Sequence, residues 1–374
     1  MDTITQGLLG AVTAQLGFRQ RIGREATWVA TIAAVVPDLD IFIMPLLSLA
    51  GVETGSFTRA RIHRGLSHSL LMTPLIALAI TGLWWWLRKS RDRKGAGNAK
   101  PQDPPPPSAP APGAPSFRLL YACVFLAVLS HPLLDWCTSY GTQLLAPISG
   151  RRLALDAAPI IDFIYTPILI VTLAACFLVR KLTRGGGRRA TLVIGWAGML
   201  LSVGYLAAGR GLHDWAAAKA RKLAGDERVL RADAYPWMGT IFLWRAVVET
   251  EDRWLVSRLH FFGNPGSDNA KFGSAAKVDN DWVRRARREA DAETFDWFAM
   301  GRVRADYARR DGMHVVEFHD MRYGRRPEST EGMWVLRVTF DESGRLLGVE
   351  RAQHFHGRDM RQYAAETWAE IWNP

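Results

Sequence analysis

The sequence predicts an α-helical membrane bundle of five to six helices, followed by a small α+β extramembrane domain with a mainly antiparallel sheet. Two observations support this fold class. The long apolar runs lie within the first 210 of 374 residues, and a helix that spans a membrane needs roughly 20 apolar residues. From about residue 226 onward, short runs of β-branched and aromatic residues alternate with polar ones, as in the strands of a soluble domain.

Residues 1–210 form the expected membrane domain. The segment 26–50 is long enough to span a membrane but contains the polar sequence Pro37-Asp38-Leu39-Asp40. Residues 3–17 are apolar but short, which indicates a tilted or half-inserted helix. Four further segments meet the length requirement, at residues 67–87, 117–137, 158–180 and 189–209.

The remaining segments are a linker, a connecting helix and the extramembrane domain. Residues 88–118 begin with Arg and Lys and continue as a Pro/Ala/Gly tract, which predicts a flexible basic linker without a core. Residues 211–225 are expected to be a connecting helix, and residues 226–374 the α+β domain. Within this domain we expect helices at 281–309 and 360–372, and strands at 241–250, 254–262, 314–319, 333–340 and 346–351.

The net charge of +11 has two interpretations. One is nucleic-acid binding, and the other is the collection of Lys and Arg in the cytoplasmic loops of a membrane protein. The second is favoured, so no nucleic-acid partner is expected. Basic residues at 19–24, 88–94 and 180–189 then mark the cytoplasmic side, which places the C-terminal domain outside, in the periplasm or the extracellular space.

Three short polar clusters lie in or beside the apolar segments, at residues 37–40, 63–69 and 130–135. Carboxylates and imidazoles are costly in hydrocarbon, so such a group predicts a functional site. Neutral imidazole with carboxylate is the ligand chemistry of zinc, with manganese or iron as alternatives. The expected ligands of this divalent metal are Asp38, His63, His68, His131 and Asp135.

The spacing of the residues within the clusters supports the prediction of a metal site. His131 and Asp135 are four residues apart, so on a helix both side chains lie on one face and can reach one ion. The expected topology also brings all three clusters, and Asp162, to the outer face. A single His beside an apolar run is more often a packed residue, and an Asp pair could bind sodium or a proton in a transporter. The prediction therefore rests on the three clusters together.

A bound metal would lower the pKa of a water molecule and polarise a substrate oxygen. Asp40 is expected to be a ligand or the base that takes a proton from that water, with Asp38 beside it. Arg64, Arg151 and Arg152 suit a phosphate group, because guanidinium pairs with it through two hydrogen bonds. The equally weighted alternative is that these arginines anchor helix ends among lipid headgroups.

These clusters, in this order, resemble the YdjM-like family of inner-membrane, LexA-regulated proteins, in its long form with a C-terminal extramembrane domain. The resemblance covers residues 1 to about 166. It comprises the Met-Asp-x-x-Thr start, Pro-Asp-x-Asp, His-Arg-Gly-x-Ser-His-Ser, and Ser-His-x-x-x-Asp followed by Thr138, Gly141 and Pro147. The family is distantly similar to zinc-dependent phospholipase C and P1-type nucleases. The resemblance therefore implies a multi-pass protein of the bacterial inner membrane that hydrolyses a phosphodiester or phospholipid with a metal.

One departure from the family pattern affects the site. The family usually carries His after the N-terminal Thr, and this chain has Gln6 there. Gln is a poor zinc ligand. The site would therefore hold fewer metals, or Gln6 would bind through its carbonyl or a water, or this member would be catalytically degraded; the six other candidate ligands favour a competent metal site. Gln6, Thr138 and Asp162 are candidates for residues that support the ligands.

The leading hypothesis is thus a membrane-embedded, metal-dependent hydrolase that cleaves a phosphoester of a lipid or envelope substrate, with membrane lipid as its partner. The alternative is a non-catalytic membrane protein with a structural metal site, whose C-terminal domain binds envelope components. A transporter is less favoured because the sequence has no repeated halves. An intramembrane protease is also less favoured, because no His-Glu-x-x-His is present. The oligomeric state remains open.

Overall fold

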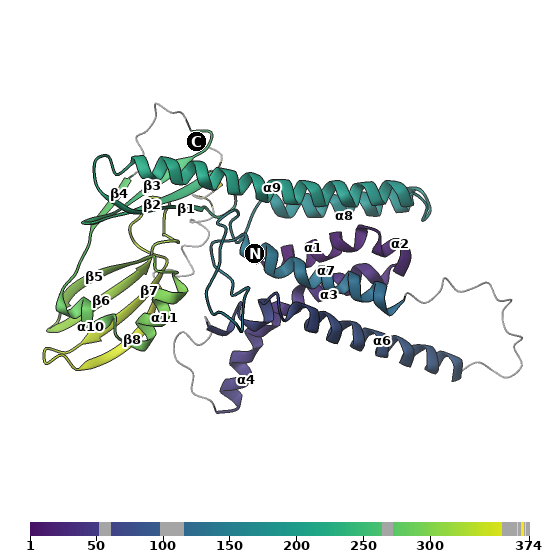
Figure 1. Cartoon of the computed structure of the whole chain (residues 1–374), viewed down its shortest axis with the longest axis horizontal. Helices are drawn as coiled ribbons and strands as arrows, with labels where there is room; N and C mark the ends of the chain where they lie inside the picture. The colour runs from purple at the N-terminus through teal and green to yellow at the C-terminus, as the bar shows by residue number, and fades with distance from the viewer. Residues whose placement is uncertain are drawn as a thin grey trace, which may run out of the picture.

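The computed structural model describes residues 1–51, 61–97, 116–263 and 272–353, together with Ala365, Trp368, Ala369 and Ile371. The chain has a helical N-terminal part and a C-terminal part with two β-sheets, which lie at one end of the helices (Figure 1). The expected fold class is confirmed. The N-terminal helices are α1 (Thr3–Gln15), α2 (Phe18–Ile22), α3 (Glu25–Val35), η1 (Val36–Phe42), α4 (Ile43–Leu49), η2 (Leu66–His68), α6 (Thr73–Gly97), α7 (Phe117–Trp136), α8 (Tyr165–Leu182) and α9 (Arg188–Lys222).

Four helical segments within the described residues are long and apolar enough to cross a membrane. They are Glu25–Leu49, Phe117–Trp136, Tyr165–Leu182 and Arg188–Lys222. The segment expected at 67–87 becomes a helix only from Thr73, because the chain before it forms the turn η2. That helix, α6, continues to Gly97, so the first ten residues of the expected linker are helical. Residues 98–115 of the linker lie outside the described residues.

Helix α1 is short but central. Its 13 residues are fewer than the roughly 20 that a membrane span needs, and most of its side chains are buried between α3, α7, α8 and α9. Gly10 permits this packing, because a Cβ atom at this position would overlap the carbonyl of Ala30 in α3. The close contact of α1 with α3 places the N-terminal residues beside the end of α3, where the Pro-Asp-x-Asp cluster begins.

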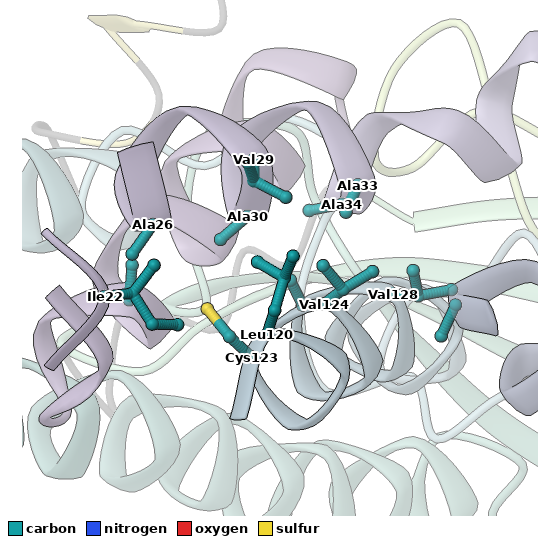
Figure 2. Close-up of a cluster of buried hydrophobic side chains, with 13 residues drawn as sticks. Ile22, Ala26, Val29, Ala30, Ala33, Ala34, Leu120, Cys123, Val124 and Val128 are labelled. Carbon is teal, nitrogen blue, oxygen red and sulfur yellow. The ribbon is translucent and has the colours of Figure 1, made fainter. Parts of the chain in front are cut away.

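A compact apolar cluster holds α3 against α7. Small side chains of α3, among them Ala30 and Ala34, face Leu120, Cys123 and Val124 of α7 (Figure 2). Because small residues let two helices approach closely, the two backbones lie near one another along this contact. The packing fixes the position of the C-terminal half of α7, which carries the Ser-His-x-x-x-Asp cluster, relative to the end of α3.

Helix α9 joins the two parts of the chain without a break. Its 35 residues include the last expected membrane span and residues 211–222 of the connecting helix expected at 211–225. The N-terminal half packs against α8, and the C-terminal half packs against β1 and β2. Ala216 and Ala220 of α9 lie in one buried cluster with Trp244 and Leu255 of the sheet. Figure 1 shows this helix running from the bundle to the sheets.

The C-terminal part consists of two four-stranded antiparallel sheets with strand orders β1-β2-β3-β4 and β5-β6-β7-β8. Each strand pairs with its sequence neighbour, so both sheets are meanders. The strands of the first sheet are β1 (Val229–Pro236), β2 (Leu243–Thr250), β3 (Arg253–His260) and β4 (Phe272–Ala276). The strands of the second are β5 (Val303–Arg310), β6 (Met313–Asp320), β7 (Trp334–Phe340) and β8 (Leu346–Gln353).

The five strands that the sequence predicts are all present, whereas the helix expected at 281–309 is wrong in its second half. The structure has two short helices there, α10 (Asp281–Ala286) and α11 (Ala290–Phe298), and then β5. Met300 and Gly301 adopt positive φ angles of 53° and 73°, which ends the helix. After this turn, Val303 and Ala305 point into the apolar core of the second sheet. The helix expected at 360–372 falls largely outside the described residues.

Candidate metal centre

Three residues from distant parts of the sequence converge inside the bundle. Asp38 of η1, His68 of η2 and His131 of α7 are buried, and one ligand atom from each lies within 4.8 Å of the others. The Nε2 atoms of His68 and His131 are 3.0 Å apart. The Asp38 Oδ1 atom lies 3.5 Å from His68 Nε2 and 3.3 Å from His131 Nε2.

These distances fit a small metal ion. Two nitrogen or oxygen ligands of a tetrahedral zinc, each about 2.0–2.1 Å from the ion, are about 3.3 Å apart. The three separations at this site, from 3.0 to 3.5 Å, bracket that value. The residues present therefore match the size and the nitrogen/oxygen chemistry of a zinc-like site.

Hydrogen bonds set the tautomer of both imidazoles. His131 Nδ1 lies 2.5 Å from the Ala34 carbonyl oxygen, which can only accept, so Nδ1 carries the proton. The Ser67 hydroxyl donates to Asp40 Oδ2 and therefore accepts from His68 Nδ1 at 2.9 Å. In each neutral ring the lone pair is then on Nε2, the atom that faces Asp38. Partners of this kind orient histidine ligands at metal sites.

The local sequence explains how Asp38 reaches the centre. Pro37 lacks a backbone N–H, and the α-helix gives way there to the 3₁₀ segment η1. Asp38 Oδ1 then faces the two imidazoles, while its Oδ2 accepts a hydrogen bond of 2.7 Å from the Thr3 hydroxyl in α1. Thr3 was not a predicted site residue. The signal in the sequence is a polar side chain in the first turn of an apolar helix.

Asp40 and His63 form a second group beside the three ligands. Asp40 Oδ1 lies 2.7 Å from His63 Nδ1, and Oδ2 accepts from the Ser67 hydroxyl at 2.6 Å and from the Arg64 amide at 3.2 Å. The His63 side chain is 20% exposed, whereas that of Asp40 is 2% exposed. His63 therefore lies outside the group of three and reaches toward solvent from an anchored carboxylate.

Asp135 lies next to the centre but has its own partners. It sits one helical turn after His131, as the spacing predicts, and its Oδ2 is 3.4 Å from His68 Nε2. Arg64 Nε lies 2.9 Å from the same oxygen. Oδ1 accepts from Gln6 Nε2 at 2.9 Å and from the Met1 amino group at 2.5 Å. Gln6 thus contacts the candidate ligands through its amide N–H, which also donates to the His131 carbonyl.

Three carboxylates lie close to the His68 ring. Its nitrogen atoms are 3.5 Å from Asp38 Oδ1, 3.5 Å from Asp40 Oδ2 and 3.4 Å from Asp135 Oδ2. Carboxylates gathered in this way would stabilise a divalent ion among the ligands.

The predicted arginines have different surroundings. Arg64 donates to Thr138 Oγ1 at 3.1 Å, and its guanidinium lies 4.5 Å from the centre of the Tyr140 ring. Arg152 is buried and donates to the carbonyls of Tyr140 and Gly141. Its guanidinium lies 5.1 Å from the centre of the Tyr140 ring and equally far from two aromatic rings of α11, those of Trp297 and Phe298. Burial lowers the pKa of Arg152 to about 9. Arg151 is exposed.

Asp162 and Thr138 support the backbone. Asp162 accepts from the amides of Ile164 and Tyr165, where α8 begins, and from the Tyr205 hydroxyl. It caps a helix and lies outside the group of three. Thr138 closes the end of α7 by donating to the Asp135 carbonyl at 2.8 Å.

The C-terminal part contacts the loops around the centre. Arg322 donates to the carbonyls of Ser139 and Tyr140 at 3.0 and 3.1 Å, and it pairs with Asp320. Arg61, two residues before His63, donates to Thr294 of α11 at 2.7 Å. These contacts depend on the tertiary fold, and the sequence patterns around Arg322 and Tyr140 did not reveal them.

Comparison with known proteins identifies the family. The model of the YdjM inner membrane protein family matches residues 1–211, which include all three polar clusters and the helices that carry them. The searches of curated proteins and of solved structures found no match. The family name and the four apolar helices agree on a membrane location. On the evidence of this match over more than half its length, the chain belongs to the YdjM inner membrane protein family.

Proposed function

We propose that this protein is a membrane-embedded, metal-dependent hydrolase that cleaves a phosphoester of a lipid or envelope substrate. The observation that carries the proposal is the convergence of Asp38, His68 and His131, with both Nε2 lone pairs facing a carboxylate oxygen. A bound zinc, or manganese or iron in its place, would supply a water of lowered pKa and a Lewis acid for the substrate oxygen.

The Asp40–His63 pair supports a hydrolytic role rather than a purely structural one. Asp40 holds His63 Nδ1 at 2.7 Å, which leaves Nε2 of a partly exposed ring to accept a proton. Asp40 thus orients the base, and the base is within a ring-to-ring distance of 5.7 Å from His68. A structural metal site alone has no need of this second, solvent-reaching pair.

The substrate class is supported by charge and location. Arg64 lies beside the centre, with its Nε 2.9 Å from Asp135 Oδ2, and guanidinium groups pair well with phosphate. The four apolar helices support a lipid substrate, because a site within a membrane bundle would lie within reach of lipid headgroups. We propose further that the protein is multi-pass and that its C-terminal part lies on the periplasmic side, since the basic segments at 19–24 and 180–189 mark the opposite end of the bundle.

The test compares two histidine variants of the purified full chain. His131→Asn should lose both metal, measured by mass spectrometry, and cleavage of bis(p-nitrophenyl) phosphate and phosphatidylglycerol. His63→Gln should keep the metal and lose cleavage. His314→Gln, in the second sheet, is the control and should keep both.

Two results would count against the proposal. A wild-type chain without metal after reconstitution would remove its basis. A metal-loaded chain that cleaves neither substrate would instead favour the alternative of a structural metal site, with a C-terminal part that binds envelope components.

A further inference from the structure

A cavity of about 130 Å³ lies where the loop 137–164 meets both sheets. Ser139 and the segment 159–161 line it from the membrane part. The end of β1 and the turn after it line it from the first sheet, and Tyr323 and Trp334 line it from the second. None of the residues of the candidate metal centre is among its lining residues, so this is a separate site.

The cavity wall is apolar with a few polar groups. Ile160, Ile161, Met238 and Met333 supply apolar surface, and no Asp or Glu of the described chain lines the cavity. The Tyr323 hydroxyl is buried and has no hydrogen-bond partner within the described part of the chain. A buried hydroxyl of this kind is costly unless a ligand or water satisfies it. Ser139 supplies a second buried hydroxyl, which also has no hydrogen-bond partner among the described residues.

Neighbouring groups hold Tyr323 in place. Its ring meets the Trp334 ring edge to face, with centroids 4.5 Å apart, and the Arg322 guanidinium lies 5.4 Å from its centre. Arg322 in turn uses its N–H groups on Asp320 and on the carbonyls of Ser139 and Tyr140. The hydroxyl is therefore a fixed donor in a preformed pocket, which lowers the entropic cost of binding.

We propose that this cavity binds an acyl group. The carbonyl or carboxylate oxygen would accept a hydrogen bond from Tyr323, and the chain would pack against Ile160, Ile161 and Met238. No acidic residue is among the described lining residues, which disfavours a cation, and the buried Tyr323 hydroxyl favours an oxygen acceptor. A cavity of about 150 Å³ takes up benzene, so this one fits a short section of chain.

The position of the cavity explains why an acyl group reaches it. Ile160 and Ile161 lie shortly before α8, one of the apolar helices long enough to span the membrane. A helix that spans a membrane begins near the headgroup level, where the ester carbonyls of lipids lie. The ligand is either a free fatty acid or the acyl ester of a lipid, and both offer the same carbonyl chemistry. The proposal does not depend on hydrolase activity.

Photo-crosslinking of the full chain tests the proposal. The probes are a dodecanoic acid with a diazirine in its chain and the methyl ester of that acid, applied in dodecyl maltoside, a detergent without a carbonyl group. Peptide mass spectrometry should find the label at residues 159–161, 236–238 or 333–334, and unlabelled dodecanoate should compete. Met238→Trp, which fills the cavity, should reduce this labelling at least tenfold.

Matched variants separate the hydroxyl from general packing. Tyr323→Phe should lower labelling severalfold, whereas Tyr307→Phe, whose hydroxyl already bonds His314, should not. Val171→Trp, in an apolar groove between α8 and α9, is the control for unspecific chain binding and should also have no effect. All variants should keep the metal affinity of the wild type.

Labelling by the acid alone would identify a free fatty acid, labelling by the ester alone would identify a lipid ester, and either supports the proposal. Label confined to the faces of α8 and α9, or label in the cavity that survives both Met238→Trp and competition by dodecanoate, would overturn it.

Discussion

His68 and His131 approach each other through their Nε2 atoms, 3.0 Å apart, although 63 residues separate them in the chain. With both rings neutral, two lone pairs face one another there and also face the Asp38 carboxylate. Lone pairs in this arrangement repel unless a cation lies between them. The pair is therefore the most direct target for a test of the centre.

Replacement of His131 by Asn should abolish tight metal binding. Loss of a supporting partner of a ligand typically costs 10–100-fold in affinity, so loss of the ligand itself should cost more than about 100-fold. Titration calorimetry with zinc measures this change. Near-wild-type affinity in His131→Asn would rule out His131 as a ligand.

Thr3→Val should weaken the centre without removing a ligand. The variant keeps the shape of the side chain but loses the hydroxyl that donates to Asp38 Oδ2 at 2.7 Å. Affinity for zinc should fall roughly tenfold. Thr31→Val is the matched control, because its hydroxyl donates only to a carbonyl one turn earlier in α3. Equal affinities of the two variants would show that Thr3 does not orient Asp38.

Gly10→Ala should destabilise the bundle. The added methyl group would overlap the Ala30 carbonyl in α3, and overpacking of this kind typically costs about 1–3 kcal/mol. Gly204→Ala is the control, since a Cβ atom at this position of α9 meets nothing within 4 Å. Thermal unfolding in detergent should show a lower midpoint for Gly10→Ala alone. A shared shift would mean that helix propensity, rather than the α1–α3 contact, decides the result.

Arg322→Leu should loosen the contact between the two parts of the chain. The substitution removes two hydrogen bonds to loop 137–164 and leaves Asp320 buried without its partner. Breaking a buried ion pair from one side typically costs about 3–5 kcal/mol. The double variant Arg322→Leu/Asp320→Leu should recover part of this loss, as measured by denaturant unfolding. No recovery would show that the carbonyl contacts, not the ion pair, carry the stability.

The stability of the second sheet should depend on acid through Asp306. Partial burial raises the pKa of Asp306, but hydrogen bonds from His319 and Arg304 outweigh burial and lower the pKa to about 2. A carboxyl group with a lowered pKa stabilises the fold above its unfolded value of about 3.9, and this contribution disappears as the pH falls toward 2.

Asp306→Asn should therefore be less stable than the wild type at pH 6, and the difference should shrink toward pH 3. Because the side chain is 42% exposed, solvent limits the effect to about 1 kcal/mol or less. Unfolding midpoints at both pH values measure it. A difference that stays constant with pH would assign the loss to packing rather than to charge.

Much of the centre could be predicted from local pattern. His131 and Asp135 share a helix face because of their spacing, and Pro37 marks the point where α3 gives way to a 3₁₀ segment. The polar clusters stand out because charged groups are rare in apolar segments. Five strands were predicted from alternation, which depends only on neighbours in sequence.

The other features of the site and the fold depend on contacts between residues that are distant in sequence. The spacing of residues 63–69 does not reveal that His68 joins His131 while His63 pairs with Asp40. The tertiary position of η2 determines which of the two histidines lies beside His131. Strand β5 was predicted as helix because Ala, Arg and Glu favour helices locally, whereas pairing with β6 decides its conformation. The roles of Thr3 and Arg322 likewise follow from elements that only the folded chain brings together.

Helix α9 is unbroken, so a single helix connects the membrane part of the chain to the first sheet. Its 35 residues extend about 50 Å at 1.5 Å per residue. A rotation or tilt of its membrane half would move Trp244 and the first sheet, because they pack on its other end. One residue added within α9 would turn the first sheet by about 100° around the helix axis. The number of residues in α9 must therefore agree with the contacts that Arg322 and Arg61 make between the C-terminal part and the loops near the metal centre.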